Sequence, residues 1–234
     1  MTRGALVLAT MLSLIAAAPA VAGEVTVRGV GGSFGGAFNV PVESIREARF
    51  RTVFLQKYDF SCGSAALASL LTFHYDRPTT EIEVFNTMYE TGDQERIERL
   101  GFSLLDMKRY LAEIGLPSDG YKVSLDRLQK AGLPAIALID TDGYKHFVIV
   151  KGVSEREVLV GDPARGIRPI DRDEFKAMWN GIAFVIKSRV AEARDTFNRP
   201  ETWAVQARAP FGTALSRTSL ATFSASLFRA GRVY

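Results

Sequence analysis

The sequence predicts an α+β domain in which helices come first and an antiparallel sheet follows. Between residues 62 and 114 apolar residues recur at helical spacing, whereas residues 121–186 hold short apolar runs separated by turn residues. Helices grouped before strands are typical of the α+β class. The chain of 234 residues is 47% hydrophobic, which suffices for one domain with its own core and flanking segments.

Residues 1–22 have the pattern of a secretory signal peptide. Arg3 supplies a positive charge, residues 5–17 form an apolar run, and Ala20-Val21-Ala22 has the small side chains of a cleavage site. The mature chain is therefore expected to begin near Gly23. A retained membrane anchor is the weaker alternative, because the run is shorter than the ~20 residues that span a bilayer. No later segment is long and apolar enough to span one.

An extended N-terminal segment is predicted over residues 23–53. An alternating run from Glu24 and a second run from Phe38 to Val42 indicate strands. The glycine pairs Gly31-Gly32 and Gly35-Gly36 lie between these runs and predict a loop.

The only cysteine, Cys62, lies where an apolar helix is predicted to begin, with Ser61 as its N-cap and an apolar stripe from Leu67 to His74. A thiol in the first turn of a helix is close to free backbone N–H groups, which stabilise a thiolate and suit a nucleophile. The alternative is a buried structural cysteine. A lone cysteine in an exported chain cannot form an internal disulfide, which favours a reactive role.

Two further helices are predicted after the cysteine helix. Thr80 opens the first with the sequence of a capping box, and Ser103 caps the second, which ends near Gly115. A polar link over residues 91–99 is expected to separate them. The first half of the domain is therefore helical.

The second half of the domain is predicted to be mainly strands. Turn residues at Asp142-Gly143 and at Ser154-Glu155-Arg156 separate three consecutive strands, which indicates antiparallel pairing. The expected strands cover residues 121–123, 134–139, 146–150, 157–160 and 182–186, with helices over residues 124–131 and 172–179.

A general base for Cys62 is found by elimination, because the sequence holds only two histidines. His74 follows twelve residues along the same helix, about 18 Å away at 1.5 Å per residue, and cannot reach the thiol. His146 begins a strand directly after a tight turn, where its side chain can face a helix end. The alternative for His146 is a surface histidine at a strand end.

Asp162 is a candidate to orient the imidazole of His146. If residues 154–156 form the loop, Val153 pairs with Glu157 and Val148 lies opposite Asp162, so His146 and Asp162 become diagonal neighbours on one face. A two-residue loop would place them on opposite faces. An Asp-Pro turn residue is the alternative, and the spacing alone leaves both open.

Gln56 precedes Cys62 by six residues and is a candidate oxyanion donor. Its side-chain amide and the backbone N–H of Cys62 would both donate to the tetrahedral intermediate, and such donors contribute ~10²–10³ in rate.

Together, Gln56, Cys62-Gly63, His146 and Asp162-Pro163 resemble the peptidase domain of the bacteriocin-processing double-glycine peptidase family, over roughly residues 54–186. The resemblance implies a papain-like fold, a domain over residues 54–190, no cofactor, and cleavage after paired glycines. It also implies that Cys62 is the nucleophile, His146 the base, Asp162 its orienting partner and Gln56 the oxyanion donor. The glycine pairs before the domain then raise the alternative that the protein cuts itself there.

Better-known members of that family are attached to ABC exporters, whereas this chain has an export signal, no predicted transmembrane helix and no Gly-rich phosphate loop. It is similar to free-standing exported relatives found with secretion and functional-amyloid systems of Gram-negative bacteria. This implies a periplasmic location and a peptide or protein substrate, within a secretion or surface-fibre system.

The formal net charge of +3 is mild and gives no reason to expect a nucleic-acid partner. Residues 191–234, rich in Thr, Ser, Ala and Arg, are predicted to form a mobile tail. The alternative is a segment that docks on a partner or membrane through Trp203 and Phe211.

Two other functions stay open at this point. An exported Cys–His pair also suits a cell-wall peptidase or amidase. A catalytically silent domain that binds peptides belongs to a different class, and the presence of all four candidate residues argues against it.

Overall fold

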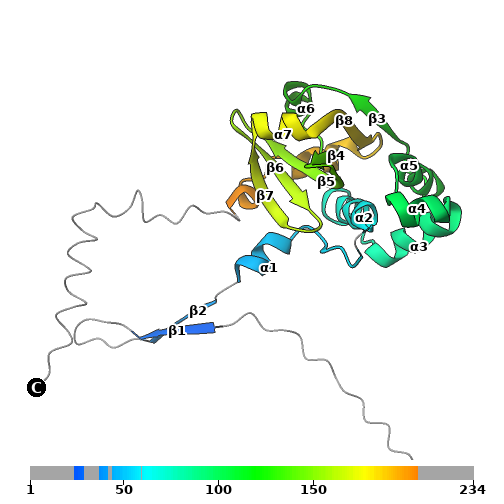
Figure 1. Cartoon of the computed structure of the whole chain (residues 1–234). Coiled ribbons are helices and arrows are strands. Elements are labelled where there is room, and N and C mark those ends of the chain that lie inside the picture. Colours follow the sequence, from blue (N-terminus) through cyan, green and yellow to red (C-terminus); the bar gives the residue numbers. More distant parts are fainter. Residues whose placement is uncertain (1–23, 29–36, 42–43, 59, 205–234) are drawn as a thin grey trace, which may run out of the picture. The chain divides into compact units, whose positions relative to one another are not determined.

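The computed structural model describes residues 24–28, 37–41, 44–58 and 60–204 (Figure 1). The chain divides into two units, Met1–Ser44 and Ile45–Tyr234. In the first unit, β1 (Glu24–Arg28) pairs antiparallel with β2 (Ala37–Pro41), which confirms the two predicted strands. The predicted signal peptide and both glycine pairs lie outside the described residues.

A six-stranded sheet forms the second half of the larger unit, with all neighbouring strands antiparallel and the order β3-β8-β4-β5-β6-β7. The α+β class is thereby confirmed. The sequence analysis missed strand β7, whose Pro169 and charged residues hide the pattern; proline is tolerated there because β7 lies at the sheet edge. The strands are β3 (Ser118–Lys122), β4 (Ala135–Thr141), β5 (Tyr144–Val153), β6 (Glu157–Asp162), β7 (Gly166–Asp171) and β8 (Trp179–Ile186).

Nine helices are described, and most begin at a polar cap. Thr80 accepts from the Glu83 N–H, and Ser103 forms a full capping box with Asp106. The predicted polar link over residues 91–99 is wrong, because helix α4 begins there with only Ile97 buried and so gives little apolar signal. The helices are α1 (Ile45–Phe50), α2 (Cys62–His74), α3 (Glu81–Thr91), α4 (Gln94–Leu100), α5 (Leu104–Glu113), α6 (Leu125–Ala131), α7 (Arg172–Met178), α8 (Val190–Thr196) and α9 (Pro200–Trp203).

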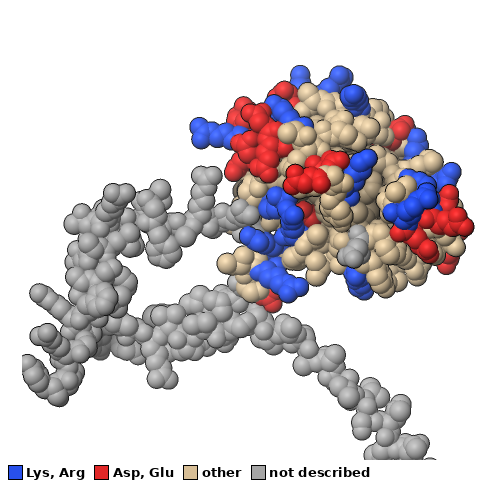
Figure 2. All heavy atoms as spheres, viewed as in Figure 1, with Lys and Arg blue, Asp and Glu red and all other residues tan. Residues whose placement is uncertain are grey.

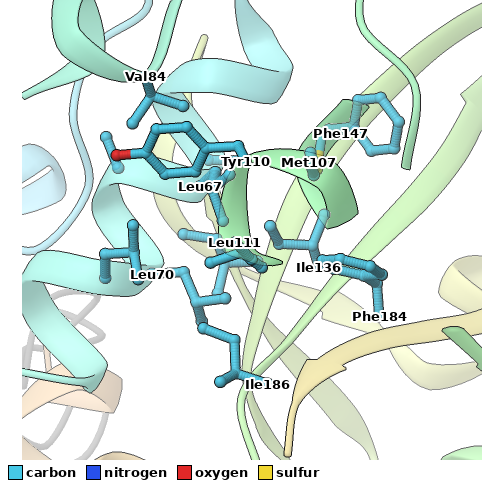
Figure 3. Packing of buried hydrophobic residues seen from close by; sticks show 14 of the residues in the cluster. Leu67, Leu70, Val84, Met107, Tyr110, Leu111, Ile136, Phe147, Phe184 and Ile186 are labelled. Atoms are coloured by element: carbon cyan, nitrogen blue, oxygen red, sulfur yellow. The ribbon is translucent and has the colours of Figure 1, made fainter. Parts of the chain in front are cut away.

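Helix α2 is the centre of the core and is buried on nearly every side, where the sequence suggested a single apolar stripe. Figure 3 shows Leu67 and Leu70 of α2 beside Leu111 of α5, with Ile136 and Phe184 of the sheet to their right. The strand residues whose side chains point to the other face of the sheet form a second apolar cluster with α6 and α7. Helices therefore cover both faces of the sheet, and α2 is held rigidly between α3, α5 and β5.

Residues 190–203 dock on the sheet, although the sequence predicted a mobile tail from Ala191. The Asn198 side chain pairs with both the N–H and the C=O of Val153, at 2.8 and 3.1 Å, and Ala193 is fully buried. The remainder of the predicted tail, residues 205–234, lies outside the described residues. The domain boundaries given above stay a prediction.

Charged side chains of both signs are interspersed over the face in Figure 2, and this mixture resembles an ordinary solvated surface. Among the described residues, none of the helices has the length and apolar character needed to cross a bilayer.

Candidate active site

Cys62 is the first residue of α2 and its side chain is almost buried, with 8% of the residue exposed. The first backbone N–H groups of a helix have no partner within it, so this end of α2 presents donors beside the thiol. Ser61 is the N-cap residue, as predicted, but its side chain makes no cap bond to these N–H groups. A Cβ at Gly63 would lie 2.9 Å from the Met107 methyl group, so glycine is what allows the helix to pack this closely.

His146 and Asp162 form a hydrogen bond of 2.7 Å between Nε2 and Oδ1, and both side chains are more than nine-tenths buried. Oδ1 of Asp162 also accepts from the N–H groups of Ala164 and Arg165, at 2.9 and 3.2 Å. Three donors thus fix the carboxylate. Because Nε2 is bonded to Asp162, the other ring nitrogen, Nδ1, is the one available to Cys62.

Burial lowers the pKa of His146, but the hydrogen bond to Asp162 and the nearby Cys62 thiol outweigh it and raise the pKa to about 9. Burial raises the pKa of Asp162, yet the His146 hydrogen bond, the Ala164 N–H and the Arg168 guanidinium together lower it. Nδ1 of His146 has no hydrogen-bond partner of standard geometry among the described residues. This nitrogen is therefore the one left for Cys62, whose thiol is near enough to raise the pKa of the imidazole.

The pairing of β5 with β6 brings His146 and Asp162 together by a route that the sequence did not reveal. The hairpin begins with Val153 opposite Val158, one residue away from the predicted pairing with Glu157. A bulge between Val150 and Gly152 then shifts the register back, so that Ile149 lies opposite Gly161. The bulge thus compensates for the one-residue difference in register at the loop. As a result, His146 and Asp162 become diagonal neighbours, as predicted.

Gln56 lies next to the loop that follows Asp162, since its N–H donates to the Pro163 carbonyl at 2.9 Å. Its side-chain Nε2 donates to the Tyr58 carbonyl at 3.1 Å, which uses one of the two N–H bonds on that nitrogen. The second N–H is left for another acceptor. Gln56 is half-buried, and its main-chain N–H and its side-chain Nε2 each donate to one backbone carbonyl.

His74 is buried at the far end of α2 and takes part in a different cluster. Its Nε2 lies 2.6 Å from Lys151 Nζ and its Nδ1 lies 2.6 Å from the Thr196 hydroxyl. Burial and the charge of Lys151 hold the pKa of His74 well below its usual range. This histidine is therefore engaged in the core, consistent with the prediction that it cannot serve Cys62.

A cleft of about 830 Å³ opens beside Cys62. Its inner wall is apolar, with Phe102, Leu138 and Phe147, and its rim carries charged side chains from α4 and β5. Tyr144 also lines it and stacks on His146, with ring centroids 5.8 Å apart. Cys62 therefore faces a cleft whose lining is both apolar and charged.

Sequence analysis missed three residues around the candidate set. Arg168 lies with Nη2 3.7 Å from Oδ2 of Asp162, Tyr144 covers His146, and Glu81 bonds to Ser61. Arg168 lies on β7, the strand that was not predicted. For Tyr144, the only indication in the sequence is that it precedes His146 by two residues. Among the described residues, no group of three His, Cys, Asp or Glu side chains is placed to hold a metal ion.

Comparison with known proteins gives consistent matches. The model of the Peptidase C39 family matches residues 51–191. The probable functional amyloid protease FapD of Pseudomonas fluorescens is 42% identical over 175 residues, which are 75% of this chain and 76% of that protein. The protein of the same name from Pseudomonas aeruginosa is 43% identical over 152 residues, or 65% and 67% of the two chains.

Among solved structures, a double glycine motif protease from an AMS/PCAT transporter, in complex with the leader peptide, is 25% identical with a TM-score of 0.48. The match covers 57% of this chain and 89% of that one. The family model spans more than half of the sequence, and the resemblance to double-glycine peptidases is confirmed. This chain belongs to the Peptidase C39 family and is a cysteine peptidase.

Proposed function

We propose that this peptidase is exported and cleaves a peptide bond in a protein of a functional-amyloid or related secretion system, with Cys62 as nucleophile. The single observation that carries the catalytic assignment is the buried His146–Asp162 pair, whose free ring nitrogen is directed to the side of Cys62. The FapD relatives support the substrate class by their name.

The proposed reaction has two stages, formation of a thioester and its hydrolysis. The Cys62 thiolate attacks the scissile carbonyl, and the second N–H of Gln56 Nε2 and the Cys62 backbone N–H stabilise the oxyanion. His146 donates its Nδ1 proton to the leaving amine, which departs and leaves a thioester. Neutral His146 then takes a proton from water, which attacks the thioester and releases the new carboxyl end with Cys62 regenerated.

Small residues before the cut suit this site. A residue without Cβ lets the substrate backbone approach the thiol most closely, and Phe102 and Phe147 line the cleft beside Cys62. We therefore propose cleavage after Gly-Gly or a similar small pair.

Cys62→Ala is the direct test. It should abolish cleavage of a peptide panel with Gly-Gly, Gly-Ala and Ala-Ala sites, and change the free energy of unfolding by no more than about 1–2 kcal/mol, because the change removes a single buried sulfur atom and leaves the helix backbone intact. Wild-type protein should cut the Gly-Gly peptide fastest.

The controls separate the alternatives. Unfolding of Cys62→Ala would support a structural cysteine, and equal rates on all three peptides would remove the preference for small residues. Digestion of peptidoglycan by wild-type protein, with the peptides left intact, would assign a cell-wall substrate instead.

A further inference from the structure

The segment between Gln56 and Cys62 is held by helix α3, which takes no direct part in the reaction. Oε1 of Glu81, the first residue of α3, accepts a hydrogen bond from the Ser61 hydroxyl at 2.7 Å and another from the Lys57 N–H at 3.1 Å. Glu81 is only 7% exposed. A buried carboxylate is costly unless it is hydrogen-bonded, and here both bonds go to one short turn of chain.

A second contact joins the same turn to the same face of α3. Phe85 lies four residues after Glu81, and its ring centroid is 5.6 Å from that of Tyr58 and 5.8 Å from that of Phe60. Residues four apart lie on one side of a helix. Helix α3 therefore supports this part of the chain with one polar residue, Glu81, and one aromatic residue, Phe85.

The contacts continue from Glu81 to the candidate oxyanion donor. Ser61 Oγ accepts from the Tyr58 N–H, and the Ser61 N–H donates to the Tyr58 carbonyl, both at 3.1 Å. That carbonyl is the group that accepts from Gln56 Nε2 at 3.1 Å. The direction of the Gln56 amide thus depends on Tyr58, whose position depends on Ser61, which Glu81 holds.

We propose that Glu81 is a positioning residue of the peptidase: its carboxylate holds Lys57 and Ser61 in place so that the Gln56 amide is aimed at the oxyanion. This inference rests on the proposed role of Gln56. Glu81 also lies in the first turn of α3, where a carboxylate interacts favourably with the helix dipole.

Three variants separate positioning from helix stability. Glu81→Met keeps the length of the side chain but removes both acceptor bonds. Glu81→Gln keeps an acceptor oxygen for Ser61 and Lys57. Glu83→Met removes an exposed carboxylate from the same helix turn and serves as the matched control.

We expect Glu81→Met to lower kcat about tenfold with little change in KM, a fraction of the ~10²–10³ expected for loss of an oxyanion donor. Glu81→Gln should keep most of the rate, and Glu83→Met should match wild type. Alkylation of Cys62 by iodoacetamide should keep its wild-type rate in Glu81→Met, because that reaction forms no oxyanion.

Combination with Gln56→Ala tests the mechanism itself. If Glu81 acts through Gln56, Glu81→Met should lower kcat no further in the Gln56→Ala background. Should Glu81→Met fail to fold, Ser61→Ala breaks the same chain of contacts and should show the same pattern.

The outcomes distinguish the two proposals. A wild-type kcat in Gln56→Ala would overturn the assigned role of Gln56, and with it this inference. An impaired Gln56→Ala together with a wild-type Glu81→Met, an additive double variant, or slowed alkylation would overturn the positioning role alone.

Discussion

At the scale of single residues, His146 is under opposing influences. Burial alone would favour the neutral imidazole, yet Asp162 and Cys62 raise its pKa to about 9. A histidine with this pKa is protonated at neutral pH, which is the form that can donate a proton to a leaving amine. The Asp162 carboxylate therefore sets both the orientation of the ring and the pH range in which it can act.

The alkaline limb of the pH profile checks this account. Because His146 loses its proton as the pH rises through about 9, we expect wild-type kcat/KM to fall with a midpoint near that value. Asp162→Asn removes the group that raises the pKa, so the midpoint should move to lower pH and the maximal rate should drop. An unchanged midpoint in Asp162→Asn would contradict the assignment, whereas His74→Gln should leave the profile as it is.

Residue types explain which parts of the site the sequence revealed. Cys62 and His146 were recognisable because the chain has one cysteine and two histidines, so few combinations exist. Glu81 is one of 26 acidic residues, and its contact with Ser61 joins segments twenty residues apart. A common residue type in a non-local contact gives no signal in a single sequence.

At the scale of elements, the β5–β6 hairpin separates what the sequence predicts, the strands, from what it does not predict, the bulge between them. Its strands were predictable from their apolar runs and turn residues, but the bulge at Lys151 was not, since the run of apolar residues continues around it. Lys151 is buried, with Nζ 3.1 Å from the Thr52 carbonyl and 2.6 Å from His74 Nε2. This contact links β5, which carries His146, to α2, which carries Cys62.

The buried amine predicts an unusual dependence of stability on pH. Burial, then the charge of Arg199, lowers the pKa of Lys151 from 10.5 to about 7. Between these two pH values the unfolded chain holds a proton that the folded chain lacks, so folding becomes more favourable as the pH rises. The slope for one proton is at most about 1.4 kcal/mol per pH unit.

Lys151→Met should remove this slope while keeping the aliphatic packing. Chemical unfolding at several pH values from 7 to 10 should show wild type gaining stability relative to the variant as the pH rises. His146 has the opposite effect, because its raised pKa makes the folded state lose stability as the pH rises from its ordinary pKa to about 9. This effect is equal in both proteins and leaves the difference between them unchanged. The exposed Lys130→Met serves as control, and parallel curves for Lys151→Met and wild type would refute a depressed lysine pKa.

At the scale of the whole chain, the peptidase unit is only part of the molecule. The unit Ile45–Tyr234 contains the candidate site, and the unit Met1–Ser44 contains the β1–β2 hairpin. Five residue pairs join β1 to β2, and residues 29–36, with their two glycine pairs, connect the strands. A cut after Gly32 or Gly36 would therefore divide the hairpin.

Two-stranded hairpins are only marginally stable even when their strands are covalently joined. A cut between β1 and β2 would remove that connection. Residues 24–28 would then be lost, together with any stability that the hairpin gives to the unit Met1–Ser44. We therefore expect the purified mature protein to begin near Gly23, as the proposed signal peptide implies, and not at Ser33 or Ala37. Intact-mass measurement of wild type and Cys62→Ala, both expressed with the full N-terminus and recovered from the periplasm, should give identical N-termini. A start at Ser33 or Ala37 that disappears in Cys62→Ala would instead demonstrate self-cleavage, and retention of residues 1–22 in both proteins would count against export by a cleaved signal.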